Sequence, residues 1–171
     1  MKPDFKKLWE MVKKKCEEFD EDPAHVMAII LAESDGDPLK DSGEARGLMQ
    51  ISRIALRDVN KIYGTHYVYD DLFDPRVNLE VGLRFLKLTK RRIRRLGYEP
   101  DIIAVGIAWN YGYGNLKKWL RLPPDNAVID EFVPTETWKH YTDVEWYYQQ
   151  LKKDPSLRWL TRRRRGGDVD E

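Results

Sequence analysis

The sequence predicts a mainly helical protein, and three observations support this fold class. Apolar residues recur at spacings of three and four in several segments, which is the period of an amphipathic α-helix. Asp-Pro pairs at 22–23 and 74–75 each supply a capping side chain followed by a proline that suits a first helical turn. The chain has 171 residues, of which 42% are hydrophobic, and this is enough for one globular domain with a sizeable core.

The first part of the chain predicts two helices. One spans 5–19, with an apolar face formed by Phe5, Leu8, Trp9, Val12, Cys16 and Phe19. Asp22 caps a second helix, which carries an apolar run and ends near Glu33, before the turn residue Gly36. We expect His25 on this helix to be structural or to face the surface.

The middle of the chain predicts two more helices, joined by a loop over 64–71. Ser52 can cap the first of them. The second begins at Asp74 and has two apolar stripes, made of Val77, Val81, Phe85 and Leu88 and of Leu79, Leu83 and Leu86. Two stripes imply burial on two sides, so this is the expected central helix. Gly82 in its middle costs about 1 kcal/mol relative to alanine, and a close helix crossing would account for it.

The last third of the chain predicts shorter elements. Residues 101–111 are nearly all apolar and indicate a short buried helix, and 116–120 form an amphipathic piece. The prolines within 122–130 indicate a loop, and 134–151 indicate a further helix. We expect 161–171 to be a flexible basic tail.

Charge and cysteine content exclude several classes of protein. The net charge is +1, so no overall field favours nucleic acid or a membrane surface, and we expect no nucleic-acid partner. The single cysteine, Cys16, rules out an internal disulfide framework. The basic run at 90–95 is most simply a solvated face, with contact to an anionic polymer as the alternative. No apolar run is long enough to span a membrane.

The N-terminus lacks the apolar core of a signal peptide. We therefore expect that the chain has lost an export signal, is delivered another way, or works from inside. Separately, we expect it to be a monomer.

One acid stands out from the rest of the chain. Glu33 closes the apolar run 28–32, and an acid at the edge of an apolar wall is poorly solvated when it is ionised. Its pKa should therefore rise, which suits a general acid near neutral pH. The polar segment 34–46 can then fold over and return Met49 and Gln50 to the neighbourhood of the acid.

The sequence around this acid reads Glu-Ser-Asp-Gly-Asp-Pro over 33–38, followed by Ser42 and by Gly-Leu-Met-Gln-Ile over 47–51. This resembles the signature of the soluble lytic transglycosylases, the SLT-type domain of glycoside hydrolase family 23 that is related to goose-type lysozyme. Their pattern is Glu-Ser-x-x-x-Pro, a serine-containing loop and Gly-Leu-Met-Gln-Ile. This chain departs from it in a loop one residue shorter than the commonest form and in Glu44, where the family often has glycine.

Later segments carry the same resemblance. The helix with Asn78 and the following glycine and Phe-Leu pair looks like the equivalent family helix. Asn110 and the glycines after it match the motif Ala-x-Tyr-Asn-x-Gly-x-Gly, in which the Asn faces the sugar, but Trp109 replaces the tyrosine. Glu136 begins a stretch similar to Glu-Thr-x-x-Tyr-Val, and Tyr141 matches its tyrosine if one residue is added after the threonine.

The resemblance covers about 22–148 and implies a lysozyme-like fold over 1–160, with a short N-terminal helical extension over about 1–21. It implies cleavage of the β-1,4 bond between N-acetylmuramic acid and N-acetylglucosamine in peptidoglycan glycan strands. Glu33 would protonate the departing oxygen, then take the proton of the muramic C6 hydroxyl, leaving a 1,6-anhydro end. The implied substrate-binding residues are Ser42, Met49, Gln50, Trp109, Asn110, Glu136 and Tyr141, with Ser42 also bonded to the acid.

Other functions stay open. A goose-type muramidase would need a second carboxylate about 5–9.5 Å from the first, and Asp35, Asp37, Asp41 and Glu44 follow in the loop. A non-catalytic glycan-binding module would not need Glu33. No spacing of His, Cys or acidic residues indicates a metal site, and no cofactor is expected. The expected place of action is the cell wall, in the periplasm, outside the cell or after delivery by a phage.

Overall fold

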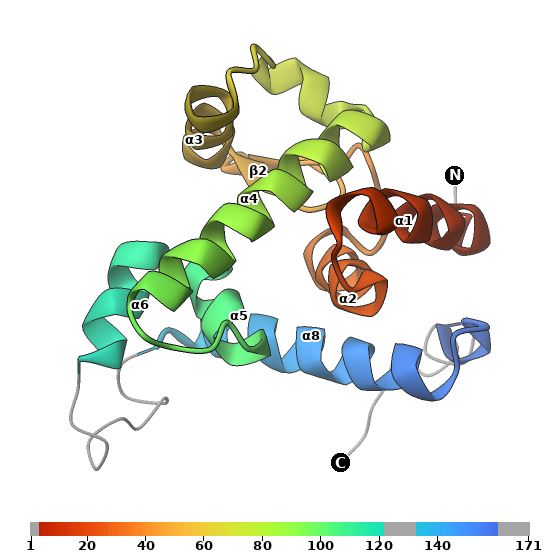
Figure 1. The fold of residues 1–171 in the computed structure, drawn as a ribbon. Coiled ribbons are helices and arrows are strands. Elements are labelled where there is room, and N and C mark those ends of the chain that lie inside the picture. The colour runs from red at the N-terminus through yellow and green to blue at the C-terminus, as the bar shows by residue number, and fades with distance from the viewer. Residues whose placement is uncertain (1–3, 122–132, 161–171) are drawn as a thin grey trace.

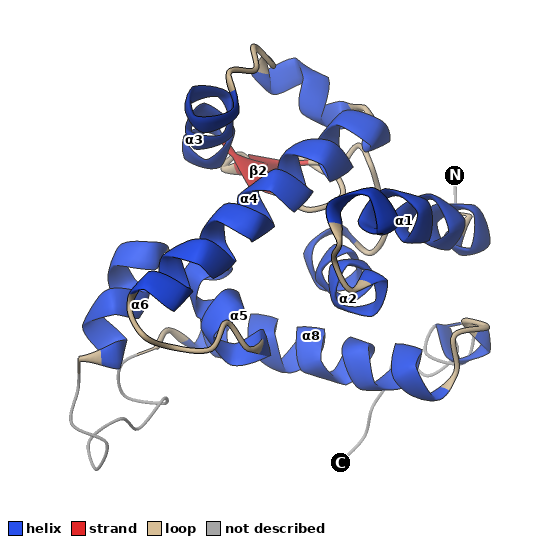
Figure 2. Ribbon diagram, in the orientation of Figure 1, coloured by secondary structure: helices blue, strands red, loops and turns tan. Residues whose placement is uncertain are grey.

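The computed structural model describes residues 4–121 and 133–160, and it confirms the mainly helical fold class (Figures 1 and 2). In chain order the elements are α1 (Phe5–Phe19), α2 (Pro23–Ser34), β1 (Ala45–Arg46), β2 (Ile51–Ser52), α3 (Arg53–Tyr63), the 3-10 helix η1 (Tyr69–Phe73), α4 (Pro75–Arg95), α5 (Ile102–Asn110), α6 (Tyr113–Leu120) and α8 (Thr135–Lys153). The predicted loop over 122–130 and the predicted tail over 161–171 lie outside the described residues. No helix in the described part of the chain is long and apolar enough to cross a membrane.

Side-chain caps fix where the predicted helices begin. Asp22 accepts a hydrogen bond from the backbone N–H of Ala24 at 2.9 Å, and Asp74 accepts one from Arg76 at the same distance. Ser52 caps α3 through the N–H of Ala55 at 3.1 Å. Each cap satisfies a donor that the first helical turn leaves without a partner.

The core forms around α2 and α5, which are apolar on all sides. In α2 the side chains from residue 24 to residue 31 are all buried, and in α5 those from 104 to 108 are buried. A helix that is apolar all round must be covered on every side. In Figure 1, α8 runs beneath both helices and contacts both, while α1 packs on α2 and α4 packs on α5.

The long helix α4 is central, as its two apolar stripes predict. It contacts α1, α3, α5, η1 and β2. Gly82 lies at a close approach, because a Cβ there would overlap the sulfur of Met49. The partner at this glycine is therefore a side chain of the segment after β1, and not another helix as expected from the sequence.

A small hairpin between α2 and α3 was not expected from the sequence. β1 and β2 pair antiparallel, with Ala45 opposite Ser52 and Arg46 opposite Ile51 (Figure 2). Strands of two residues are too short to show the alternation that marks a strand in a sequence. The hairpin turns the chain back, so that residues 47–50 lie between α2 and α4.

Candidate active site

A groove with a volume of about 530 Å³ is lined by the segment after α2, by α3 and α4, and by the junction of α5 and α6. Its lining includes five residues predicted from the sequence: Glu33, Ser42, Gln50, Trp109 and Asn110. The lining also contains Lys40 and Asp58, to which the sequence assigned no role, and Arg92 from the basic run at 90–95. The fold therefore gathers residues from distant segments at one groove.

Glu33 lies in the last turn of α2, and its side chain is only 14% exposed. Burial raises the pKa of Glu33 to about 7, and the nearby Lys40 ammonium opposes this shift only in part. The ammonium of Lys40 donates a hydrogen bond to the backbone carbonyl of Glu33. The carboxyl group is therefore partly protonated near neutral pH, as expected for an acid at the end of an apolar run.

The carboxyl group has a neutral partner on α8. Nδ1 of His140 lies 3.2 Å from Oε1 of Glu33. Burial lowers the pKa of His140 to about 4, so the imidazole is uncharged near neutral pH. The contact therefore joins the carboxyl group to an uncharged ring, and it is not an ion pair near neutral pH.

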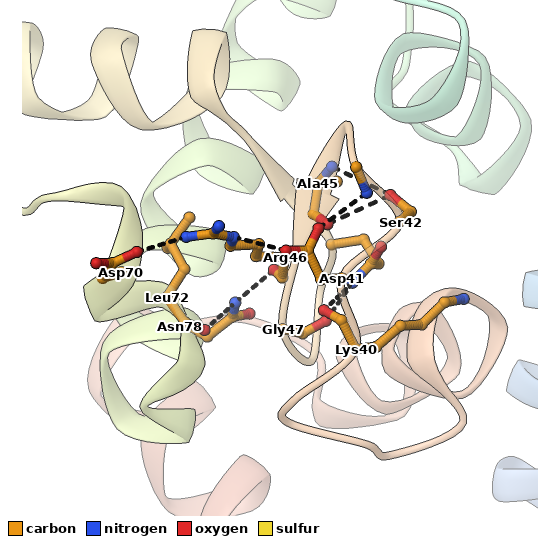
Figure 3. Close-up of polar contacts among 11 residues, drawn as sticks. Lys40, Asp41, Ser42, Ala45, Arg46, Gly47, Asp70, Leu72 and Asn78 are labelled. Atoms are coloured by element: carbon orange, nitrogen blue, oxygen red, sulfur yellow. Dashed lines mark hydrogen bonds and ion pairs between the residues drawn. The ribbon is translucent and has the colours of Figure 1, made fainter.

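Asn78 on α4 holds the 46–49 segment in place (Figure 3). Its side chain is fully buried. Its Oδ1 accepts from the N–H of Met49 at 2.8 Å, and its Nδ2 donates to the carbonyls of Arg46 and Leu72, both at 2.9 Å. A single amide thus satisfies three backbone groups and ties the segment after β1 to α4 and η1.

Arg46 fixes the outer side of the same segment (Figure 3). Its Nε donates to Asp41 at 3.1 Å and its Nη1 to Asp70 at 2.7 Å. The guanidinium also lies over the rings of Tyr69 and Phe73, at 4.1 and 4.7 Å from their centroids. These contacts connect the loop after α2 to η1.

Gln50 and Gly47 close the turn that faces Glu33. Gln50 has a left-handed backbone, with a φ of 49°. Its Nε2 donates to the carbonyls of Gly47 at 2.9 Å and Lys40 at 3.1 Å. The side chain therefore braces the turn, and it lines the groove as predicted.

Trp109 and Asn110 form the opposite part of the lining. Nε1 of Trp109 donates to the carbonyl of Met49 at 3.3 Å, and its ring meets Phe85 edge to face at 5.1 Å between centroids. Oδ1 of Asn110 accepts from the hydroxyl of Thr137 at 2.7 Å. Both side chains are positioned by contacts with other segments and line the groove.

Two expected roles do not match the positions of the residues. Met49 is fully buried against Gly82, so its side chain packs in the core and does not line the groove. Ser42 lines the groove, but its hydroxyl donates to the carbonyl of Ala45 at 3.3 Å and accepts from the N–H of the same residue at 3.1 Å. The hydroxyl therefore braces its own turn, and no hydrogen bond joins it to Glu33.

The structure does not support the alignment of Glu-Thr-x-x-Tyr-Val in which one residue is added after the threonine to reach Tyr141. Tyr141 is 5% exposed and packs against Gly106, where a Cβ would collide with it. Glu136 is exposed in the first turn of α8 and does not line the groove. Counted without an addition, the pattern Glu-Thr-x-x-Tyr that starts at Glu136 reaches His140, which is the residue that contacts Glu33.

The loop acids are arranged unequally around the groove. Glu44 lines it, and Asp58 on α3 also lines it but is paired with Arg92 at 3.3 Å. Asp41 is bound by Arg46, and Asp37 accepts from the N–H of Leu39 at 2.9 Å. Of the four loop acids proposed as a second carboxylate, only Glu44 is part of the groove lining.

A helical domain with a buried acid at the edge of a groove has the architecture of a lysozyme-like protein. The model of the family described as "Transglycosylase SLT domain" matches residues 10–130, which is most of the chain. The chain therefore belongs to this family. No curated protein sequence matches it.

Solved structures with the same fold include an inactive mutant of the lytic transglycosylase Slt from Pseudomonas aeruginosa, with 20% identity, a TM-score of 0.69 and 84% of this chain covered. The 70 kDa soluble lytic transglycosylase SLT70 from Escherichia coli is 24% identical, also with a TM-score of 0.69, over 85% of this chain. A complex of the 70 kDa soluble lytic transglycosylase with bulgecin A is 22% identical, with the same TM-score and coverage. The matched region is 24% of each of those longer chains.

Proposed function

We propose that this chain is a lytic transglycosylase that cleaves the β-1,4 bond between N-acetylmuramic acid and N-acetylglucosamine in peptidoglycan. Family membership supports the class of reaction. The observation that carries the proposal for this chain is Glu33, a largely buried carboxyl group at the groove with its pKa raised to about 7. Such a group holds a proton near neutral pH and can also release it.

In the proposed reaction, Glu33 first protonates the departing glycosidic oxygen as the bond to the muramic C1 breaks. The substrate's own N-acetyl group stabilises the positive charge that develops at C1. The Glu33 carboxylate then removes the proton from the muramic C6 hydroxyl. The oxygen of that hydroxyl bonds to C1. One carboxyl group thereby returns to its starting state, and the product ends in a 1,6-anhydro ring with no water consumed.

Trp109 and Asn110 are the proposed sugar contacts, because both line the groove beside Glu33. An indole ring can stack on a sugar face, and an amide can hydrogen-bond to hydroxyl or N-acetyl groups. We propose that the domain acts on glycan strands of the cell wall, where this polymer is found.

Hydrolysis is a second candidate, because Glu44 lines the groove and could serve as the second carboxylate. A carboxylate in the groove lining can activate water in an inverting mechanism or attack C1 in a retaining one, depending on its distance from the acid. A glycan-binding module without catalysis is less favoured, because it has no use for a buried acid that is costly to ionise.

The deciding experiment is mass spectrometry of muropeptides released from purified peptidoglycan. Products one water lighter than hydrolysis products, lost in Glu33→Gln but kept in the exposed α1 control Glu17→Gln, would support the proposal. Reducing-end products that disappear in both Glu33→Gln and Glu44→Gln would establish hydrolysis instead. Release of nothing by the wild-type protein, over walls from several sources, would favour the binding module.

A further inference from the structure

We propose that His140 is a positioning residue, whose Nδ1–H holds Oε1 of Glu33 so that the catalytic proton is carried on Oε2. This role rests on the proposed function, because it has a catalytic meaning only if Glu33 is the catalytic acid. The hydrogen bond itself is a separate claim and can be tested without any substrate.

The two side chains lie within hydrogen-bonding distance of each other. His140 Nδ1 and Glu33 Oε1 are 3.2 Å apart, and the two side chains are 7% and 14% exposed. In so little water, a hydrogen bond to a carboxyl group is stronger than the same bond at the surface. His140 is held by its place on α8, which packs on both α2 and α5.

Few ionisable side chains of α2, α5 and the groove lining lie near Glu33 and His140. The ionisable side chains of α2 are Glu33 and His25, which lies at the opposite end, and α5 has none. From the loop after α2, Lys40 acts on Glu33. The remaining ionisable side chains of the groove lining are Glu44, Asp58, Arg92, Tyr111 and Tyr113.

The tautomer of His140 follows from its two nitrogen atoms. Burial lowers the pKa of the ring to about 4, so a single proton is shared between Nδ1 and Nε2 near neutral pH. Nε2 is buried and has no hydrogen-bond partner in the described part of the chain. A proton on Nε2 would be an unpaired buried donor, whereas a proton on Nδ1 bonds to the carboxylate, so Nδ1–H is favoured.

This tautomer places the proton of Glu33. When Oε1 accepts from Nδ1–H, the proton of the neutral carboxyl group belongs on Oε2, which is free to serve the departing oxygen. The same bond favours the ionised carboxylate and so limits how far burial raises the pKa of Glu33. Both halves of the proposed cycle, proton donation and proton removal, then remain accessible near pH 7.

The alignment of the third motif suggests why a histidine can occupy position 140. Without an added residue, His140 occupies the tyrosine position of the pattern Glu-Thr-x-x-Tyr. A phenol O–H and an imidazole Nδ1–H each donate one hydrogen bond. His140→Tyr should therefore keep the donor, whereas His140→Phe removes it with a ring of similar shape.

The first test measures the pKa of Glu33 from the carbon-13 NMR shift of its side-chain carboxyl in the free protein. His140→Phe should raise that pKa by about one pH unit, the size expected for losing a hydrogen bond to a charged group. His140→Tyr should bring it back toward the wild-type value. The matched control is His25→Phe, because His25 is equally buried but lies away from the groove, and it should change nothing.

An unchanged pKa of Glu33 in a folded His140→Phe protein would overturn the proposal. His140→Leu, which also removes the donor, replaces it if the Phe variant fails to fold. Nitrogen-15 NMR of His140 gives an independent result: a protonated Nδ1 is expected near pH 7, and a protonated Nε2 would contradict the assigned bond.

The second test measures the pH dependence of muropeptide release. His140→Phe should lower kcat roughly 10- to 100-fold, as expected for a misplaced catalytic group, with a smaller change in KM. The loss of activity at high pH should also begin at a higher pH than in the wild type. If the wild-type protein released no products, the proposed function would fail, while the NMR results would still decide the bond.

Discussion

Asp22 and Glu33 stand at the two ends of α2, and their surroundings move their pKa values in opposite directions. Burial raises the pKa of Asp22, but hydrogen bonds from the N–H of Ala24 and from Tyr148, together with Lys152, outweigh it and leave the pKa below its ordinary value. Burial also raises the pKa of Glu33, to about 7, and the charge of Lys40 opposes this shift only in part. The positive end of a helix favours the first carboxylate and the negative end disfavours the second.

The comparison shows what an acid must lack in order to keep a proton. Asp22 is bonded by a backbone donor, a hydroxyl at 3.1 Å and an ammonium at 3.5 Å. Glu33 has a neutral imidazole on its carboxyl group, and the ammonium of Lys40 bonds its backbone carbonyl instead. A well-paired carboxylate stabilises the fold, whereas a poorly paired one retains a proton at the expense of stability.

The largest expected effect is stabilisation by Glu33→Gln. The rise in pKa from 4.5 to about 7 corresponds to up to about 3 kcal/mol. The folded protein holds this proton more tightly than the unfolded chain. The free energy of unfolding therefore falls as the pH rises from 4.5 to about 7 and stays lowered above that.

Urea denaturation at pH 8 and at pH 4 checks this prediction. Glu33→Gln should exceed the wild type by up to about 3 kcal/mol at pH 8 and nearly equal it at pH 4. Equal stability at both pH values would mean that Glu33 ionises without cost, and the contrast with Asp22 would then disappear.

The fold and the position of Glu33 could be predicted from local sequence because both depend on neighbouring residues. Caps such as Asp22 and Ser52 and the apolar period are read directly from the chain. Glu33 stands out because its own helix supplies the apolar surroundings that raise its pKa.

The rest of the site depends on contacts between distant segments. Met49, in the segment between β1 and β2, is buried because Gly82 on α4 leaves space for it. His140 and Tyr141 are adjacent in sequence, but successive residues on a helix point about 100° apart. Only the packing of α8 decides that His140 reaches Glu33 while Tyr141 packs on Gly106.

At the other end of α2, removal of the Asp22 side chain should destabilise the protein. Asp22→Ala loses the cap on Ala24 and should cost about 1 kcal/mol at pH 7, whereas Asp22→Asn should cost less because asparagine is an equally good cap. Denaturant titration of both variants checks this. A cost for Asp22→Asn equal to that for Asp22→Ala would show that charge, and not the cap, dominates at this end.

The pH dependence of Asp22 has the opposite sign to that of Glu33. Its lowered pKa contributes stability above the ordinary value of 3.8, and this contribution is lost as the pH falls toward the folded pKa. The difference between the wild type and Asp22→Asn should therefore shrink on acidification below 3.8. A difference that grew in acid would contradict the assigned direction.

A smaller effect is expected from the cation near Glu33. Lys40→Met removes a positive charge that lowers the pKa of Glu33, so that pKa should rise further above 7, by less than one pH unit because Lys40 is exposed. Carbon-13 NMR of the carboxyl group measures this directly. The matched control is Lys61→Met, an exposed lysine on α3 that does not line the groove, and no change is expected there.

The smallest effect is expected from the cation near Asp22. Lys152 is half exposed, and its Nζ lies 3.5 Å from Oδ2 of Asp22, so the pair is well screened by water. Lys152→Met should therefore cost less than about 0.5 kcal/mol and raise the pKa of Asp22 only slightly, since the bonds from Ala24 and Tyr148 remain. Urea denaturation at low and high salt provides the measurement. A larger, salt-sensitive loss would mean that long-range charge sets the pKa at this end of α2, whereas a small loss would leave burial and short hydrogen bonds as the cause at both ends.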